Sequence, residues 1–499
     1  MPTVPMAAAE VDAPQRRRTS LTVASGLLGV STIASRLTTL VAMALLARGA
    51  GTEAVGYYGL ATLIASFTAA GLSVGLPTYL TRDFAAGLVS APQVARIHCG
   101  RLVTLLLAAV VAYPVAGGLL PGLIQLGFFL FFAASLLEQW NETAWVLVRG
   151  TRSAWLEPLT NSATGVLLIV ACSAETWLGD GLAFGEAAGY FVAASVLRSA
   201  MAFIVVGMWR QVRSPGRVDP MTQLRRSLPY FASDLLGLLY FRGDVFILAM
   251  FVAASEVGEY VSAAAIIGPA VQVAASMGLG AVAYAAPRLL SDRSPSDDPV
   301  TIFRFFRISG QAAAGLICLA LPVGVVVLFG GEGDDILALA TILTLFLALR
   351  FANFGLSAML LAHGRATSRL LVLVVSLGGN VVLNLALDGR YGAHGAAWAT
   401  VLTELIVAGS LLWFLRIRAL VRPVLVSAAG VAVAAAALIG ARAAVEPALA
   451  TMVPGGCLLA LAALGLLRQR RAARRTVDPA GAENDEQHTA DPQRRATAR

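Results

Sequence analysis

The sequence contains no lysine, and charged residues of all kinds make up only 13% of its 499 residues. Soluble proteins carry about twice that charged fraction, because most of their surface faces water. A soluble fold of this length would lack the polar surface it needs, whereas a content of 58% apolar residues suits a chain surrounded by lipid. The scarcity of charge therefore predicts an integral membrane protein.

Cysteine and histidine are also scarce, with four of each. They are Cys99, Cys172, Cys318, Cys457, His98, His363, His394 and His488. No CxxC pair or histidine cluster occurs, which excludes a disulfide framework and predicts no metal site. The sequence also lacks a nucleophile–base set and a phosphate-binding loop, so we expect no enzyme activity and no cofactor.

The net charge of +8 rests on 37 arginines, and such a basic balance raises the possibility of nucleic-acid binding. The arginines stand in short blocks between apolar runs, however, and do not form one basic face. Blocks of this kind are typical of the cytoplasmic loops of membrane proteins. We therefore expect membrane lipid, and no nucleic acid, as a partner.

Runs of about 20 apolar residues predict membrane-spanning helices. Cutting the chain at charge clusters and at Gly/Pro turns gives fourteen spans, so the predicted fold class is an all-α integral membrane protein. The spans are 21–47, 54–80, 100–119, 122–148, 155–173, 184–209, 228–253, 257–286, 304–329, 335–361, 370–387, 392–416, 423–441 and 448–467.

The arginines also predict the orientation of these spans. With residues 1–20 in the cytoplasm, thirty arginines fall in cytoplasmic segments or at the cytoplasmic ends of spans, against three in outside loops and four deep within spans. A bias of this size follows the positive-inside rule. We therefore predict a multi-pass protein of the cytoplasmic membrane with both termini inside, a cytoplasmic linker at 210–227 and a disordered cytoplasmic tail at 468–499.

A weak internal repeat divides the chain. Gly56 and Tyr58 match Gly258 and Tyr260 at a shift of 202 residues, and Phe184-Gly-Glu-Ala-Ala188 matches His394-Gly-Ala-Ala-Trp398 at a shift of 210. Two matches at nearly one shift indicate two six-helix bundles, 21–209 and 228–416, in the same orientation. Residues 417–467 then form two additional helices. Transporters built from parallel repeats place their substrate between the halves.

Three segments carry a resemblance to a known family. They are LLARGAGTEAVGYYGLA (45–61), YFRGDVFILAMFVAASEVGEYVSAAAI (240–266) and YGAHGAAWATVLTE (391–404). In order and spacing they resemble polysaccharide-biosynthesis flippases of the multidrug/oligosaccharidyl-lipid/polysaccharide (MOP) exporter superfamily. The likeness runs from about residue 20 to 420.

The resemblance implies that the chain moves a polyprenyl-diphosphate-linked oligosaccharide between leaflets by alternating access. Its cavity would be lined by spans 21–47, 54–80, 228–253 and 257–286. Glycosyltransferases or a polysaccharide polymerase would be its protein partners. A drug/cation antiporter of the same superfamily and a lipid II flippase are alternatives, although Ser35-Arg36-Leu37-Thr38-Thr39 stands where a lipid II flippase would have SRxxGxxRD. A membrane glycan ligase or polymerase would need a larger outside loop than this chain has.

Placing an ionisable residue within an apolar span costs free energy, so we expect each such residue to have a structural or functional role. Glu138, Arg198, Arg350 and Glu404 lie at similar depth, about 15–17 Å from the cytoplasmic ends of their helices at 1.5 Å per residue. We predict two structural pairs, Glu138 with Arg198 and Arg350 with Glu404, with contact to the substrate as the alternative.

A second set of ionisable residues lies on spans 21–47 and 228–253. Arg36 and Arg242 stand at matching depth, and Asp234 and Asp244 lie on the same span as Arg242. Guanidinium groups bind phosphate through paired hydrogen bonds. We therefore predict that Arg36 and Arg242 bind the cargo and that Asp234 and Asp244 hold Arg242, with an internal Arg242–Asp pair as the alternative.

Overall fold

The computed structural model describes residues 21–85, 87–117, 122–148, 155–178, 182–213, 219–290, 299–330, 333–363 and 365–477. Every regular element within these ranges is an α-helix, which confirms the predicted all-helical class. The predicted N-terminal segment 1–20 lies outside the described residues, as do residues 478–499 of the predicted tail.

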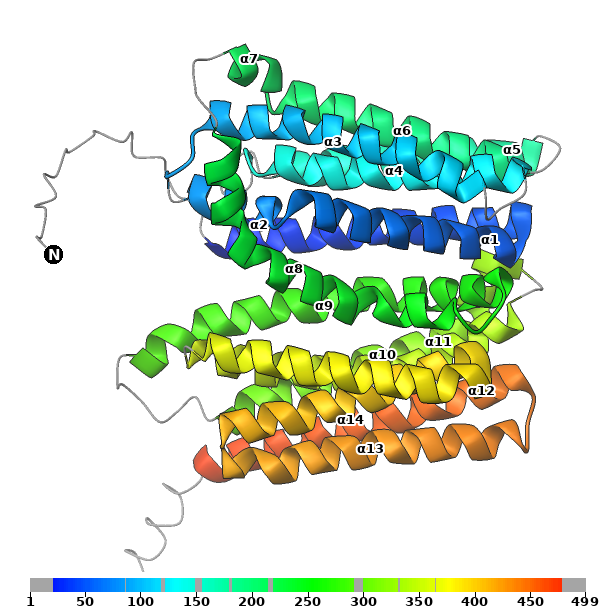
Figure 1. Cartoon of the computed structure of the whole chain (residues 1–499). Helices are drawn as coiled ribbons and strands as arrows, with labels where there is room; N and C mark the ends of the chain where they lie inside the picture. Colours follow the sequence, from blue (N-terminus) through cyan, green and yellow to red (C-terminus); the bar gives the residue numbers. More distant parts are fainter. Residues whose placement is uncertain are drawn as a thin grey trace, which may run out of the picture.

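The helices fall into two halves followed by a C-terminal pair (Figure 1). The N-terminal half consists of α1 (Leu21–Ser73), α2 (Leu76–Ala85), α3 (Ala91–Gly117), α4 (Gly122–Trp145), α5 (Leu156–Leu178), α6 (Phe184–Val205) and α7 (Met208–Arg213). The C-terminal half consists of α8 (Pro220–Leu248), α9 (Ala254–Leu290), α10 (Pro299–Phe329), α11 (Asp334–Ala362) and α12 (Ala366–Leu415). The final pair is α13 (Arg418–Arg442) and α14 (Pro447–Val477).

Two of the helices each contain two of the predicted spans. Helix α1 is broken at Gly51, where φ is 83°, and α12 is broken at Gly392, where φ is 55°. Glycine adopts such positive φ values without the steric cost that a side chain adds. Each helix therefore forms two arms, and the arms of α1 lie side by side in Figure 1.

Ten helices in the described residues are long and apolar enough to cross a membrane. Helices α4 and α8 are not among them, because each carries several charged or amide side chains in its middle. They lie alongside the others in Figure 1. Together with the second arms of α1 and α12, they account for the fourteen predicted spans.

The structure shifts some predicted boundaries. The stretch 210–227, predicted as a linker, is helical at both ends, because α7 reaches Arg213 and α8 begins at Pro220. Asp219 accepts a hydrogen bond from the Met221 N–H, and Pro220 occupies the first helical position, so the local sequence starts a helix there. Helix α14 continues to Val477, so the start of the predicted disordered tail is helical.

Helix α11 forms the centre of the C-terminal half. It is apolar around its whole circumference, and most of its residues are buried. A helix of this kind requires neighbours on all sides, and α11 packs against α9, α10 and α12. Helices α13 and α14 then cover α10 on its outer side.

The two halves meet mainly where α1 packs against α9, and α8 also leans across to α2 (Figure 1). The two ends of the described chain lie at one end of the bundle, which we call the terminal end. The opposite end, where α1 breaks at Gly51, is called the far end. The space between the halves is set by these two contacts.

Candidate functional site

A cavity of about 1150 Å³ lies between the two halves. Helices α1 to α6 line one side, and α8, α9, α11 and α12 line the other, so the walls include more helices than the sequence predicted. Every intramembrane residue that the sequence singled out lines this cavity. They are Arg36, Glu138, Arg198, Asp234, Arg242, Asp244, Arg350 and Glu404.

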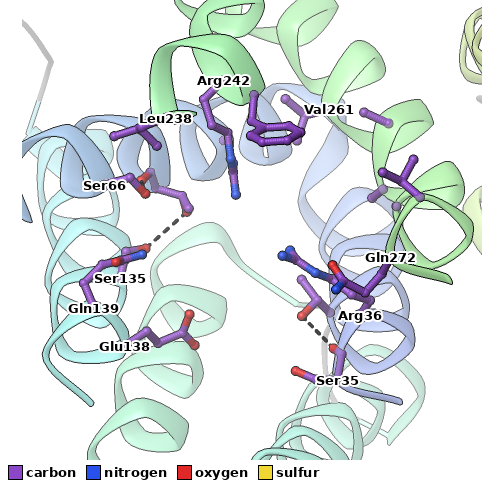
Figure 2. Close-up of a pocket in the computed structure, with 18 of the residues that line it drawn as sticks. Ser35, Arg36, Ser66, Ser135, Glu138, Gln139, Leu238, Arg242, Val261 and Gln272 are labelled. Atoms are coloured by element: carbon purple, nitrogen blue, oxygen red, sulfur yellow. Dashed lines mark hydrogen bonds between the residues drawn. The ribbon is translucent and has the colours of Figure 1, made fainter. Parts of the chain in front are cut away.

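Arg36 of α1 and Arg242 of α8 project into the cavity without a partner. Figure 2 shows their guanidinium groups entering the same space from different walls. Within the described residues, neither donates a hydrogen bond nor forms an ion pair, and their positive charges repel each other. Two unpaired guanidinium groups in one cavity favour an anion between them.

The two aspartates of α8 are engaged elsewhere. The Thr78 hydroxyl of α2 donates to both carboxylate oxygens of Asp234, at 2.9 and 3.0 Å. The Tyr260 hydroxyl donates to Asp244 at 2.5 Å, and the Val245 N–H donates to it at 2.9 Å. Neither aspartate accepts a hydrogen bond from Arg242 in the described residues, but the negative charge of Asp244 attracts Arg242. That these aspartates hold Arg242 in place stays a prediction.

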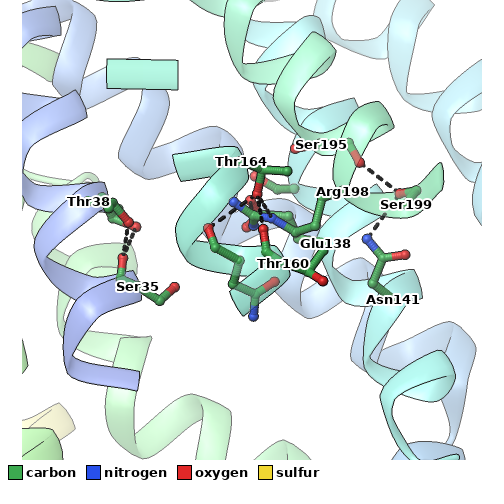
Figure 3. A network of polar contacts seen from close by, with 12 residues as sticks. Ser35, Thr38, Glu138, Asn141, Thr160, Thr164, Ser195, Arg198 and Ser199 are labelled. Atoms are coloured by element: carbon green, nitrogen blue, oxygen red, sulfur yellow. Dashed lines mark hydrogen bonds and ion pairs between the residues drawn. The ribbon is translucent and has the colours of Figure 1, made fainter. Parts of the chain in front are cut away.

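An ion pair stands at the cavity wall of the N-terminal half (Figure 3). Arg198 of α6 donates to Glu138 of α4 at 2.7 Å, and its Nε donates to the Thr164 hydroxyl of α5 at 3.0 Å. The Glu138 side chain is 46% exposed, against 15% for Arg198. The structure thus brings the predicted partners together while leaving part of the carboxylate open to the cavity.

The C-terminal half contains the second pair in a closed environment. Arg350 of α11 lies 3.2 Å from Glu404 of α12, whose side chain is 1% exposed. Arg350 also donates to the Tyr240 hydroxyl at 2.6 Å, and the Asn353 amide donates to Glu404 at 2.8 Å. Four aromatic rings surround the Arg350 guanidinium within 5.9 Å of their centroids, those of Tyr240, Phe241, Phe346 and Phe354. Such rings stabilise a cation away from water.

Backbone-to-backbone packing closes the cavity toward the far end. A Cβ atom on Gly56 would lie 1.7 Å from the Ala254 carbonyl oxygen, and one on Gly258 would lie 1.9 Å from the Thr52 oxygen. The shift of 202 residues converts one contact into the other, since Thr52 corresponds to Ala254 and Gly56 to Gly258. The repeat seen in the sequence is therefore a reciprocal contact between α1 and α9, and small residues permit it.

A polar stripe on the first arm of α12 was missed by the sequence analysis. Asn380, Asn384 and Asp388 are spaced four residues apart, which places them on one helix face. All three are at most 5% exposed, and their side-chain oxygens accept no hydrogen bond in the structure. The predicted span ended at residue 387, so Asp388 was assigned to a loop. The four-residue polar spacing was the available signal.

A second missed group lies at the terminal end of the cavity. Arg101, assigned from the sequence to a cytoplasmic segment, is 5% exposed on α3 and lines the cavity. It donates to the Thr143 hydroxyl at 3.0 Å and to the Ser73 hydroxyl at 2.5 Å, while the His98 ring stacks on Trp140. These contacts join α1, α3 and α4, so Arg101 holds the N-terminal half together.

Sequence comparison gives little information on this chain. No protein-family model matches it. The uncharacterized membrane protein YabM of Bacillus subtilis (strain 168) is 34% identical over 107 residues, which are 21% of this chain and 19% of that protein. The match therefore spans about a fifth of the relative's length.

Comparison of the folds is more informative. The lipid II flippase MurJ in an inward closed conformation superposes with a TM-score of 0.65 at 12% identity, over 89% of this chain and 99% of that one. An inward-facing multidrug resistance MATE family transporter of the MOP superfamily gives a TM-score of 0.59 at 19% identity, over 79% and 98%. This chain has the MOP transporter fold. A MOP superfamily transporter from Pyrococcus furiosus gives 0.55 at 17% identity, over 80% and 96%.

Proposed function

We propose that this protein is a flippase that moves a polyprenyl-diphosphate-linked oligosaccharide across the cell membrane by alternating access. Glycosyltransferases would supply such a cargo, and a polysaccharide polymerase would consume it. The observation that carries the proposal is the pair of unpartnered arginines, Arg36 and Arg242, in a cavity between two repeat-related halves.

The arginines suit a diphosphate because of its charge and geometry. A diphosphate loses water when it enters a cavity within the membrane, and guanidinium groups replace that hydration with charge-assisted hydrogen bonds. Each such bond contributes about 1.5–3 kcal/mol. Because Arg36 and Arg242 lie on different halves, they can hold a phosphate group while the halves move relative to each other.

The similar structures support a lipid II flippase and a drug antiporter as well as a glycan flippase. A cationic drug would require unpaired carboxylates, whereas Glu138 and Glu404 form ion pairs and Asp234 and Asp244 accept hydrogen bonds. The arginines therefore favour an anionic cargo. The absence of the SRxxGxxRD motif around Arg36 favours a lipid-linked glycan other than lipid II.

Alternating access requires a cavity that closes at one end at a time. In this structure the Gly56–Ala254 and Gly258–Thr52 contacts close the far end. The arginine distribution in the sequence assigns the terminal end to the cytoplasm, so this state is closed toward the outside. Cargo would leave when α1 and α9 separate at these glycines.

The polar stripe of α12 offers a site for the ion that couples to transport. Both carboxylate oxygens of Asp388 lack a donor although the residue is 1% exposed. A buried carboxyl group without a donor is protonated or holds a cation, because an isolated charge is costly there. Replacing Asp388 with Asn should uncouple transport from a proton or sodium gradient, whereas unchanged ion dependence would reject this role.

Transport can be tested in liposomes with a polyprenyl-diphosphate–N-acetylglucosamine probe that carries a fluorophore on the sugar. An impermeant quencher reports the fraction of the probe that reaches the outer leaflet. Arg242→Ala should abolish translocation at normal protein level, and Arg242→Lys should restore part of it, because lysine cannot form the paired hydrogen bonds. Arg36→Ala should reduce translocation in the same direction.

The result that would contradict the proposal is normal translocation by the Arg36→Ala, Arg242→Ala double variant. A fluorescent organic cation serves as the comparison cargo in the same liposomes. Gradient-driven cation transport that survives the double variant would favour the drug antiporter instead.

A further inference from the structure

The two walls of the cavity present repeat-related positions with different chemistry. Thr62 and Ser66 on the second arm of α1 correspond, at the shift of 202, to Ala264 and Gly268 on α9, and all four line the cavity. The positions are equivalent in the repeat, but among these four residues only the two of the N-terminal half carry hydroxyl groups. This difference cannot come from the fold, which places both pairs alike.

Helix α4 extends the polar character of the N-terminal wall. Ser135 and Gln139 lie one turn apart and face the cavity beside Ser66 (Figure 2). The Ser135 hydroxyl is 3.2 Å from the Thr62 hydroxyl. The opposite helix of the C-terminal half, α11, lines the cavity with Leu343 and Phe346 instead. Hydroxyl and amide groups of α1 and α4 therefore stand where α9 and α11 present apolar and aromatic residues at the repeat-related positions. The amide and hydroxyl groups of the C-terminal wall lie elsewhere, at Gln272 on α9 and at Asn380, Thr400 and Thr403 on α12.

One member of this surface has a buried acceptor that is not satisfied. Asn141 of α4 is 2% exposed and lines the cavity. Its amide nitrogen donates to the Ser199 hydroxyl at 3.0 Å, but its side-chain oxygen accepts no hydrogen bond in the structure (Figure 3). Buried polar atoms are almost always paired, so an unpaired one at a cavity wall indicates a missing donor.

We infer that the N-terminal wall, formed by Thr62, Ser66, Ser135, Gln139 and Asn141, binds the saccharide of the cargo. The inference rests on the proposed function, because the lipid diphosphate brings the saccharide into the cavity. Sugar hydroxyl groups donate and accept hydrogen bonds at once, and hydroxyl and amide side chains do the same.

The hydrogen bonds within the wall determine whether its groups donate to the ligand or accept from it. The Ser66 hydroxyl donates to the Thr62 carbonyl oxygen of its own helix at 2.8 Å, so its free lone pairs accept from a ligand. The Asn141 oxygen is likewise an acceptor. The wall therefore selects a ligand that presents several O–H or N–H donors, which a glycan does and an aliphatic chain does not.

The test compares binding of two lipids to the full-length protein in lipid nanodiscs. One is a polyprenyl diphosphate without sugar, and the other carries a single N-acetylglucosamine. Wild type should bind the glycosylated lipid about tenfold more tightly, the size of one or two hydrogen bonds. The Ser135→Ala, Gln139→Leu variant should lose this gain while binding the bare diphosphate as wild type does.

Ser262→Ala is the matched control, because Ser262 is a buried serine of α9 that does not line the cavity. It should keep the sugar-dependent gain. A wall variant that keeps the gain, or that weakens both lipids equally, would overturn the saccharide site. Failure of wild type to bind the bare diphosphate would instead overturn the proposed function, so the two failures are distinguishable.

Discussion

The ion pair of the N-terminal half is open to the cavity, whereas the ion pair of the C-terminal half is almost completely buried at the cavity wall. Glu138 is 46% exposed beside Arg198, but Glu404 is 1% exposed beside Arg350. The same contrast recurs in the walls, where hydroxyl and amide groups of α1 and α4 face small apolar and aromatic residues of α9 and α11.

The two halves therefore use their polar groups for different tasks. The C-terminal half uses its buried charges for rigidity, since Arg350 fixes Tyr240 and Phe241 just before Arg242 on α8. The N-terminal half leaves its polar groups accessible, which suits contact with a changing ligand. An asymmetric cavity therefore forms between two halves of the same fold.

The largest expected effect comes from breaking the buried pair. Arg350→Ala leaves Glu404 without a partner, and an uncompensated buried charge costs about 3–5 kcal/mol. Arg198→Ala should cost about 1 kcal/mol or less, because solvent screens the exposed Glu138. The folded yield and the thermal unfolding midpoint in detergent measure both effects.

The pairing itself is checked by a double variant. Glu404→Ala added to Arg350→Ala should recover part of the stability, because no charge is then left buried. Independent and additive losses would show that the two residues are not coupled. Equal destabilisation by Arg198→Ala and Arg350→Ala would remove the contrast between the halves.

The second prediction concerns the contact between α1 and α9 at the far end, where equivalent substitutions in the two halves should have equal effects. Gly56→Ala and Gly258→Ala each place a methyl group against a backbone carbonyl, which cannot move aside. Each should destabilise the far-end contact by about 3 kcal/mol, at the upper end of overpacking. A cysteine at Val261, which lines the cavity, should then react with an impermeant reagent added from the far side.

Gly71→Ala is the control for this experiment, since no atom lies within 4 Å of a Cβ at Gly71. It should leave the Val261 cysteine unreactive from the far side. The labelling requires a background in which the four native cysteines are replaced. Strongly unequal effects of the two glycine substitutions would show that the contact is not reciprocal.

A smaller effect is expected from the repeat-related tyrosines. Tyr260→Phe removes the hydroxyl that donates to Asp244 and should cost about 2 kcal/mol, the size of a hydrogen bond to a charged group. Tyr58→Phe should cost less, because no carboxylate accepts a hydrogen bond from the Tyr58 hydroxyl in the described residues, and the ring keeps its packing against Phe131 and Phe191. The thermal unfolding midpoint of each variant measures these effects. A larger decrease of the midpoint for Tyr58→Phe than for Tyr260→Phe would contradict this assignment.

Much of this fold could be predicted from the sequence, because membrane-spanning helices require long runs of apolar residues. The ion pairs were also predictable, since the fixed rise of a helix converts residue number into depth. Gly56 and Gly258 emerged as repeat positions, and the structure gives them their physical role as a close helix contact.

The remaining features depend on how each helix is rotated about its own axis. The depth of a residue along its helix does not determine this rotation. Asp234 and Asp244 accept hydrogen bonds from Thr78 and Tyr260 on other helices, and the sequence did not indicate these partners. The sequence analysis missed the start of α8 because its first turns are polar. Arg225 and Arg226 there are typical of a cytoplasmic loop.

The predicted orientation can be tested separately from the cargo. Cysteines placed at Gly181 and Gly333 should react with an impermeant reagent added to intact cells, and one placed at Pro215 should not. Labelling of the Pro215 position from outside would reverse the assignment of the terminal end to the cytoplasm.

Recognition of the diphosphate is the central claim, and binding of three lipids to the protein in nanodiscs tests it most directly. The lipids are geranylgeranyl diphosphate, its monophosphate and the uncharged alcohol. Wild type should bind the diphosphate at least about tenfold more tightly than the alcohol, with the monophosphate between them. The Arg36→Ala, Arg242→Ala variant should bind all three alike. Equal binding of the three lipids by wild type, or full discrimination by the double variant, would contradict the account.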